Sequence, residues 1–272
     1  MTALIFDCDG VLADTERHGH LPAFNRTFKE FGLPAHWTEG EYGVALGIGG
    51  GKERMRALLT PEFVAQAGLP TDPDAQAAEI AQWHKRKTAL YVEMVRAGEL
   101  PPRPGVARIV DEARAAGWQL AVCSTSAEPS VRAILENAVG ADVAADFLVL
   151  AGDVVSAKKP APDIYLLALE QLGIEPGEGI VVEDSRNGLL ASAAAGLTTV
   201  VTVNGYTREQ DFSEAALVVS SLGDPDEPPI EILANRPGAG PVGWGRLSDL
   251  EACVGSPGSG RGAPRSPARR VA

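Results

Sequence analysis

The sequence has few cysteines, no long apolar run and too few basic residues to balance its acidic ones. Its 272 residues include three cysteines, Cys8, Cys123 and Cys253, whose spacing fits no metal site. Cys8 and Cys123 end apolar runs, so we expect small buried side chains and a reducing compartment. No apolar stretch is long enough to span a bilayer, and no secretory signal precedes the first one, so we expect no membrane partner.

The charge balance also narrows the choice of partners. A formal net charge of -12 argues against nonspecific binding to nucleic acid. Residues 255–272 are rich in Gly, Pro, Ser and Arg, and we expect a solvated tail there. A nucleic-acid partner for that tail is the alternative, and it requires an affinity that salt abolishes. Against this acidic background, a local basic cluster points to an anionic small-molecule substrate.

The stretch Leu4–Thr15 is the most informative part of the chain. An apolar run leads directly into Asp7 and Asp9, and Gly10 follows them. This pattern is typical of a buried parallel strand that ends at a functional edge of its sheet. Two carboxylates this close repel each other unless a divalent cation lies between them or one is protonated. The plainer alternative is a strand that ends in a solvated turn.

The next eighty or so residues differ in character and predict a helical insertion, which we place at residues 16–100. Phe24, Phe28 and Phe31 share one face of a predicted helix, and a second helix is predicted over 74–97, with its buried side at Ile80, Trp83, Tyr91, Met94 and Val95. Between them a glycine-rich loop, 47–51, leads into Lys52 and Arg54. The proline-rich stretch 100–105 reads as the hinge back to the core.

Strands alternate with helices after the hinge, which predicts βαβ units and a doubly wound α/β sheet. Residues 1–15 and 101–222 therefore form the expected core, in two pieces. Strands are expected at 118–123, 147–150, 179–182 and 198–203, and helices at 106–116, 129–138, 162–172 and 188–195. From residue 223 onward prolines are frequent, so we expect a largely disordered extension over 223–272. A short amphipathic segment is the alternative at 242–254.

Polar residues follow four of the predicted core segments, and together they suit phosphoryl transfer. Ser124 and Lys159 join the first two aspartates, and Glu183 and Asp184 complete the set. A phosphate monoester is anionic, so a nucleophile can approach only when a cation and fixed donors offset that charge. Each residue alone has an ordinary explanation, such as a helix cap for Ser124. Their joint placement favours a catalytic site.

A role follows for each of these residues. Asp7 attacks phosphorus, and Asp9 serves as acid and base for the leaving alkoxide and the water. Mg²⁺ is expected as cofactor, held by Asp7, the backbone carbonyl of Asp9 and Asp184, with Glu183 binding it directly or through water. Ser124 donates to a phosphoryl oxygen, and Lys159 neutralises charge.

These motifs resemble, residue by residue, those of the haloacid dehalogenase-like hydrolases, with the insertion in the place of that family's helical cap. The stretches 48–55, 83–88, 122–126, 151–155 and 205–208 are similar to its CbbY branch. That resemblance implies a phosphatase that hydrolyses xylulose-1,5-bisphosphate, a Rubisco misfire product, to xylulose-5-phosphate, in carbon fixation by the Calvin cycle. It implies a functional link to Rubisco without direct binding.

A bisphosphate needs a second cationic seat besides the one at Asp7. Lys52 and Arg54, beside backbone N–H groups of the glycine-rich loop, suit that seat. The expected substrate-binding residues are Glu16, His20, Gly50, Gly51, Lys52, Glu53, Arg54, His84, Lys87, Ser124, Thr125, Ser126 and Lys159. A solvated helical face is the alternative for residues 84–87.

Other functions fit some of the same residues. Within enzymes, the alternatives are β-phosphoglucomutase and a general sugar-monophosphate or phosphoglycolate phosphatase. A noncatalytic module that binds a phosphorylated ligand is the alternative outside enzymes. The first strand begins almost at Met1, so we expect a bacterial cytoplasmic protein or a trimmed chain of the plastid stroma, acting as a monomer.

Overall fold

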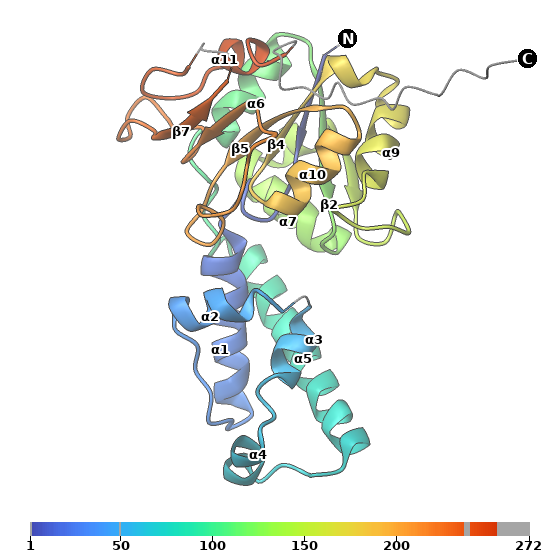
Figure 1. The fold of residues 1–272 in the computed structure, drawn as a ribbon, viewed down its shortest axis with the longest axis vertical. Helices are drawn as coiled ribbons and strands as arrows, with labels where there is room; N and C mark the ends of the chain where they lie inside the picture. The colour runs from blue at the N-terminus through green and yellow to red at the C-terminus, as the bar shows by residue number, and fades with distance from the viewer. Residues whose placement is uncertain (1, 49, 237–239, 255–272) are drawn as a thin grey trace, which may run out of the picture.

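One β-sheet and a separate bundle of helices, joined end to end, make up the computed structural model, which describes residues 2–48, 50–236 and 240–254 (Figure 1). The sheet and its helices form the core, and the bundle lies beyond one edge of that sheet (Figure 1). Among these residues, no helix combines the length and the apolar character needed to cross a membrane.

The described strands form a single seven-stranded sheet in the order β3-β2-β1-β4-β5-β6-β7. All neighbours run parallel except β6 and β7. The chain winds outward from β1 to one side and then to the other, so the predicted doubly wound α/β fold is confirmed. The strands are β1 (Ala3–Phe6), β2 (Gln119–Ser124), β3 (Phe147–Ala151), β4 (Gly179–Glu183), β5 (Thr198–Thr202), β6 (Leu217–Val219) and β7 (Ile232–Asn235).

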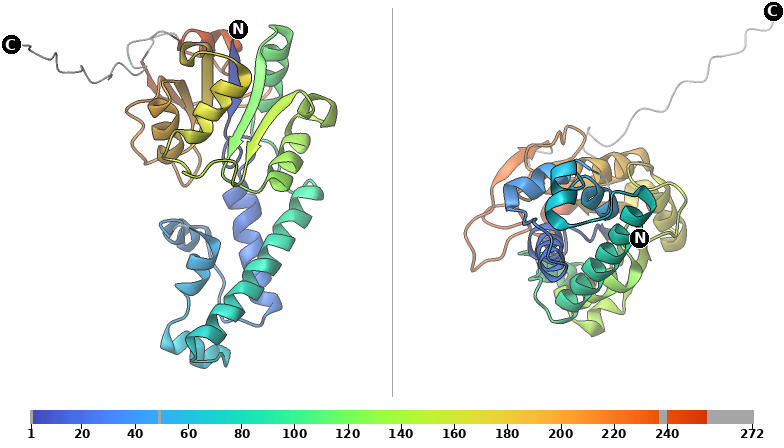
Figure 2. Two further views of the ribbon diagram at one scale, coloured as in Figure 1. Left: turned by 90° about the vertical axis from the view of Figure 1, so that its right-hand side faces the viewer. Right: turned by 90° about the horizontal axis from the view of Figure 1, so that it is seen from below.

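Helices cover both faces of the sheet (Figure 2). Leu4 and Phe6 of β1 pack on one face, and Ala3 and Ile5 pack on the other, because successive side chains of a strand alternate. The first face is covered by α6 (Val106–Ala115), α7 (Glu128–Val139) and α11 (Leu247–Glu251). The second is covered by α9 (Asp163–Leu172) and α10 (Arg186–Ala194), and the short elements α8 (Ala141–Ala144) and η2 (Pro176–Glu178) lie in the connections.

The helical bundle has an aromatic core of its own. Phe24 contacts Phe28, Trp37 and Tyr42, with ring centroids 5.0–6.1 Å apart. Phe31, expected on the same buried face, is 37% exposed because the helix ends at Glu30, before it. The elements of the bundle are η1 (Glu16–His20), α1 (Leu21–Glu30), α2 (Glu39–Ala45), α3 (Gly51–Arg56), α4 (Pro61–Ala67) and α5 (Pro73–Arg96).

Two chain segments connect the bundle to the core, and Arg103 fixes the second of them. Its backbone N–H donates to the Leu12 carbonyl at 2.9 Å. Its guanidinium donates to the carbonyls of Val203 (2.7 Å), Thr202 (3.1 Å), Ser220 (2.5 Å) and Gly10. A guanidinium with this many carbonyl acceptors ties the hinge to the ends of β1, β5 and β6.

The expectation of a largely disordered extension from residue 223 is wrong for its described part. Strand β7 adds to the sheet antiparallel to β6, α11 buries Leu250 against the core, and Cys253 is buried just after that helix. The prolines do not prevent this, because Pro225, Pro228, Pro229 and Pro241 fall between the elements rather than within them. The expected tail at 255–272 lies outside the described residues.

Candidate active site

The carboxyl ends of β1, β2 and β4 lie side by side, and each places a polar residue at the same edge of the sheet. Asp7 follows β1, Ser124 ends β2, and Glu183 and Asp184 end and follow β4. This edge lies where the chain reverses its winding, which is the usual place for a ligand in an open α/β sheet. The structure therefore brings the candidate catalytic residues together.

Lys159 reaches into this group from the loop between β3 and α9. Its Nζ lies 2.6 Å from Asp7 Oδ1, 2.6 Å from Glu183 Oε1 and 2.9 Å from the Cys123 carbonyl. Burial alone would lower the pKa of the Lys159 ammonium, but the charges of Asp7 and Glu183 outweigh burial and raise it. The side chain is thus a fixed cation, 8% exposed, at the base of the site.

The carboxylates outnumber the cations here, which is the reason to expect a metal. Burial raises the pKa of Asp7 to about 7, although Lys159 opposes the shift. Burial also raises the pKa of Asp184, and the neighbouring charges of Glu183 and Asp7 add to the effect. Ligand oxygens of Asp7, Glu183 and Asp184 lie within 4.8 Å of one another. Buried carboxylate oxygens that converge in this way suit a hard divalent cation.

Glu183 is the most constrained member of the cluster. Its Oε1 accepts from Lys159 and from the Tyr165 hydroxyl (2.6 Å), and its Oε2 accepts from the Asp184 backbone N–H at 3.1 Å. Gly188 packs so closely that a Cβ there would lie 1.9 Å from the carboxylate. Both oxygens are thus already engaged, and Glu183 orients Lys159 in this structure.

Asp9 points away from this cluster. Its Oδ2 accepts from the Ser126 hydroxyl at 2.5 Å, and its Oδ1 is buried without a partner among the described residues. Ser124 Oγ accepts from the Ser126 backbone N–H at 3.1 Å and keeps its own hydrogen to donate. Asp9 and Ser124 line the same pocket as Asp7, with the Asp9 carboxylate turned toward Ser126.

A pocket of about 600 Å³ opens at this edge and is shared with the bundle. From the core, it is lined by the predicted residues Asp7, Asp9, Ser124, Thr125, Lys159 and Asp184. The bundle contributes Glu16, Gly50 and Arg54. Arg54 donates to the Tyr42 hydroxyl at 3.0 Å, and that hydroxyl donates to Glu16 Oε2 at 2.5 Å. The bundle side of the pocket thus presents one guanidinium that Tyr42 and Glu16 hold in place.

A second polar pair lies deeper in the bundle. Lys87 Nζ is 2.9 Å from His20 Nδ1 and lies over the ring of Phe24, 4.6 Å from its centroid. Burial lowers the pKa of Lys87 to about 8 and holds that of His20 well below its usual value, so His20 accepts the hydrogen bond as a neutral ring. Neither residue lines the pocket.

The remaining predicted binding residues also lie outside the pocket lining. Lys52 and Glu53 are exposed on α3, and His84 is half-buried against the backbone of Gly51. Gly49, part of the predicted glycine-rich loop, lies outside the described residues. A part for Lys52, Glu53, Gly51 and His84 in binding stays a prediction.

Comparison with known proteins identifies the family. A family model described as a haloacid dehalogenase-like hydrolase matches residues 1–196. The chain belongs to the haloacid dehalogenase-like hydrolases. Among the relatives of this hydrolase, a CBBY-like protein of Arabidopsis thaliana is 48% identical and covers 83% of this chain and 70% of that protein. Protein CbbY of Cupriavidus necator is 43% identical, and the match covers 93% of this chain and 96% of that protein.

Solved structures agree with this assignment. CbbY from Rhodobacter sphaeroides in complex with phosphate is 38% identical, has a TM-score of 0.67, and covers 81% of this chain and 95% of that chain. A mutant of the same protein in complex with xylulose-(1,5)-bisphosphate matches with a TM-score of 0.68 over the same shares. The hydrolase thus falls in the CbbY branch of the superfamily and is a phosphatase.

Several residues at this phosphatase's pocket could not be predicted from the sequence. Tyr42 and Tyr165 hold Glu16 and Glu183, but in the sequence they are ordinary apolar positions of helices. Asn204, Tyr206 and Thr207 line the pocket from the turn after β5, and Asn204 bonds Asp184. The stretch 205–208 is similar to the CbbY branch, but nothing in the sequence places it beside Asp184.

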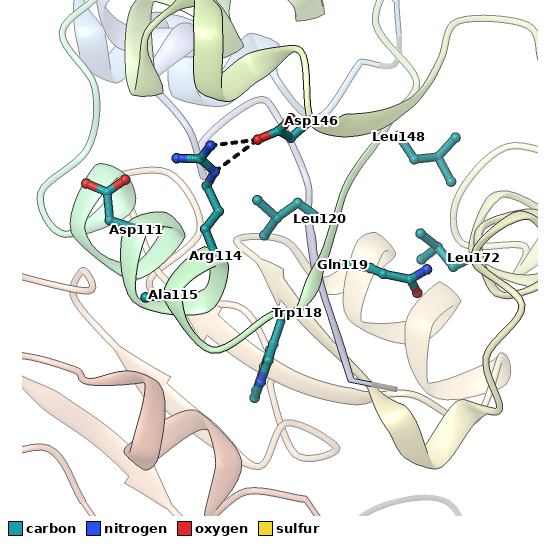
Figure 3. A pocket seen from close by; sticks show the side chains of 9 residues that line it. All are labelled: Asp111, Arg114, Ala115, Trp118, Gln119, Leu120, Asp146, Leu148 and Leu172. Carbon is teal, nitrogen blue, oxygen red and sulfur yellow. Dashed lines mark hydrogen bonds and ion pairs between the residues drawn. The ribbon is translucent and has the colours of Figure 1, made fainter.

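A larger hollow of about 720 Å³ lies at the opposite edge of the sheet (Figure 3). It is formed where β2 and β3 begin, and Arg114 and Asp146 pair across it at 2.7 Å. Leu120, Leu148 and Leu172 complete much of its wall (Figure 3). None of the catalytic candidates lines it. The catalytic candidates instead line the smaller pocket at the carboxyl ends of the strands.

Proposed function

We propose that this protein is a Mg²⁺-dependent sugar-bisphosphate phosphatase that hydrolyses xylulose-1,5-bisphosphate to xylulose-5-phosphate and phosphate. The observation that carries the proposal is the buried group of Asp7, Lys159 and Asp184, which shares one pocket with Arg54 of the bundle. The helical bundle, residues 16–100, is then the cap. A cap cation opposite a phosphoryl site suits a substrate with phosphate at both ends.

The proposed reaction begins at Asp7. Lys159 occupies Oδ1, so the other carboxylate oxygen attacks phosphorus, and the bond from phosphorus to the sugar oxygen breaks. Asp9 donates a proton to the leaving alkoxide. A water then attacks the aspartyl-phosphate as Asp9 takes its proton, and the phosphorus–Asp7 bond breaks to release phosphate.

The other residues stabilise charge in both steps. Ser124 donates to a phosphoryl oxygen, and Lys159 neutralises charge on Asp7 and the phosphoryl group. Mg²⁺ would be held by Asp7, Asp184 and the backbone carbonyl of Asp9, near Glu183, and when bound it offsets the negative charge of the phosphate. Arg54 holds the second phosphate, with Glu16 near the sugar hydroxyls.

The proposed setting is the one that the sequence and its resemblance to the CbbY branch predict. A small phosphorylated sugar is the partner, with neither nucleic acid nor a membrane involved, and the enzyme acts as a monomer. It serves the Calvin cycle by removing an inhibitor of Rubisco, in a bacterial cytoplasm or a plastid stroma.

The test is phosphate release, with Mg²⁺, from xylulose-1,5-bisphosphate, ribulose-1,5-bisphosphate, phosphoglycolate and β-glucose-1-phosphate. We expect strong preference for the xylulose bisphosphate. Equal rates on the small monophosphates would contradict the substrate assignment and leave a general phosphatase. Transfer of phosphate between sugar positions, without release, would identify a mutase instead. Absence of activity on every compound would favour a noncatalytic binding module.

A further inference from the structure

The turn after β5 lies beside the proposed cation site, yet the proposed chemistry does not use it. The turn covers Asn204, Gly205, Tyr206 and Thr207, and three of these four residues line the pocket. Asn204 is half-buried and lies against Asp184. Its amide is the feature that links this turn to the acidic cluster.

The orientation of the Asn204 amide is fixed by its own turn. Oδ1 accepts from the backbone N–H groups of Tyr206 (2.8 Å) and Thr207 (3.1 Å). Nδ2 donates to Asp184 Oδ2 at 2.7 Å. Flipping the amide would leave two N–H donors without an acceptor and would set oxygen against oxygen. Asn204 therefore presents a donor to Asp184.

Asp184 is confined on its other side by Gly10. A Cβ at Gly10 would lie 2.1 Å from Asp184 Oδ2, so the carboxylate packs directly on the glycine backbone. Side-chain atom Oδ2 is thus held between Gly10 and the Asn204 amide. Atom Oδ1 is the oxygen of Asp184 that remains for a cation.

Thr207 stabilises the turn without touching Asp184. Its hydroxyl accepts from the Asn204 backbone N–H at 3.0 Å, and its side chain is buried. The bonds that shape the turn and the bond that holds Asp184 are therefore made by different atoms. Substitution can separate the two.

We propose that Asn204 is a positioning residue for the cation site: its amide holds Oδ2 of Asp184 so that Oδ1 is presented to the cation. The inference rests on the proposed Mg²⁺ site at Asp7 and Asp184. It assigns to Asn204 the task of keeping Asp184 in one orientation, as hydrogen-bonding partners of metal ligands do elsewhere.

The test is Mg²⁺ affinity of the substrate-free protein, measured by titration calorimetry. Asn204→Ala should weaken binding roughly 10- to 100-fold, the usual effect of losing a partner of a metal ligand. Thr207→Val is the matched control, since it removes a bond of the same turn and leaves the Asn204–Asp184 bond in place. We expect it to bind Mg²⁺ as wild type does. Thermal unfolding of both variants without Mg²⁺ establishes that they are folded.

Two results would overturn the inference alone: wild-type affinity in Asn204→Ala, or equal weakening in Thr207→Val. Failure of the proposed cation site would look different. In that case the wild type would bind no Mg²⁺, or Asp184→Asn would bind it as tightly as wild type, and the inference would fall with the site.

Discussion

At Lys159, one buried ammonium faces the carboxylates of Asp7 and Glu183 at 2.6 Å each. Taking these charges out of water is costly, and the arrangement is tolerated because the three groups compensate one another. Its position is set by bonds to Asp7, Glu183 and the Cys123 carbonyl, so it serves the fold and the reaction together.

Replacing Lys159 should therefore damage both stability and activity. For Lys159→Met, we expect a loss of about 3–5 kcal/mol in the free energy of unfolding, because buried carboxylates lose their partner. Phosphate release should fall by roughly 10²–10³-fold. Lys158→Met is the control for stability: its ion pair with Asp153 is exposed and should contribute at most about 1 kcal/mol. Urea unfolding measures the stability of the two variants. Equal stability would contradict the role of Lys159 as the buried partner of Asp7 and Glu183.

Lys87 makes the free energy of unfolding depend on pH, and its pKa shift sets the direction of that dependence. Burial lowers its pKa in the folded protein from 10.5 to about 8. Between these values the unfolded chain keeps a proton that the folded chain has lost, so raising the pH favours the folded state. Relative to Lys87→Met, the wild type should gain stability from pH 8 to 10.5. Urea unfolding across that range measures the difference, and parallel curves for the two proteins would show that Lys87 is not buried as described.

At the scale of elements, residues 240–254 contribute to the core, and α11 lies within the short amphipathic segment allowed at 242–254. Leu250 is fully buried against α6, and the backbone N–H of Leu247 donates to Glu112 at 2.7 Å. Helix α11 has only five residues, so its stability comes from packing rather than from its own hydrogen bonds.

A core role for α11 predicts a clear loss on truncation. Leu250→Ala should lower the free energy of unfolding by about 2–5 kcal/mol, as for a fully buried leucine. Val242, 78% exposed in the same extension, is the control, and Val242→Ala should change stability by less than about 0.5 kcal/mol. Chemical denaturation distinguishes them. A negligible effect of Leu250→Ala would mean that α11 is not part of the core.

Elements with a strong local pattern could be predicted from the sequence, and those without one could not. Strand β1 and helix α6 lie close to the expected positions. The apolar run before Asp7 marks the strand, and the glycine after α6 marks the end of the helix. Strand β7 is short and partly exposed, and prolines flank it, so its pairing with β6 has no local signal.

The same limit applies to the site. Asp7, Ser124, Lys159 and Asp184 could be found because each follows a strand or precedes a helix of a parallel sheet. The contacts Arg54–Tyr42–Glu16 and Asn204–Asp184 form between distant segments through the tertiary fold. No local sequence pattern predicts these contacts.

At the scale of the whole molecule, the helical bundle meets the core in two places. Leu90, Met94 and Val95 of α5 belong to the buried cluster on one face of the sheet, and a second contact lies at the pocket. Tyr206, on the turn that holds Asp184, lies edge-on to Tyr42 of α2, with ring centroids 6.0 Å apart. Tyr42 in turn holds Arg54 over the pocket. Two adjoining aromatic rings thus join the turn beside Asp184 to the bundle side of the pocket, as the proposed bisphosphate, which would contact both sides, requires.

This arrangement predicts a specific effect of Arg54 on the bisphosphate. Arg54→Met should lower kcat/KM for xylulose-1,5-bisphosphate by about 10- to 100-fold, the value of a charged hydrogen bond, and leave a monophosphate substrate nearly unaffected. Arg56→Met is the matched control, because Arg56 is exposed on the same helix and should have no effect on either. Equal loss on both substrates in Arg54→Met would show that Arg54 serves the cap fold rather than the second phosphate.

The most direct measurement compares phosphate release from xylulose-1,5-bisphosphate, with Mg²⁺, by the wild type and by Asp7→Asn. Because Asp7 is the proposed nucleophile, the wild type should turn the substrate over, and the variant should release no phosphate above the uncatalysed rate while remaining folded. A variant that keeps the wild-type rate would contradict nucleophilic catalysis by Asp7, and a wild type inactive on this substrate would contradict the proposed function.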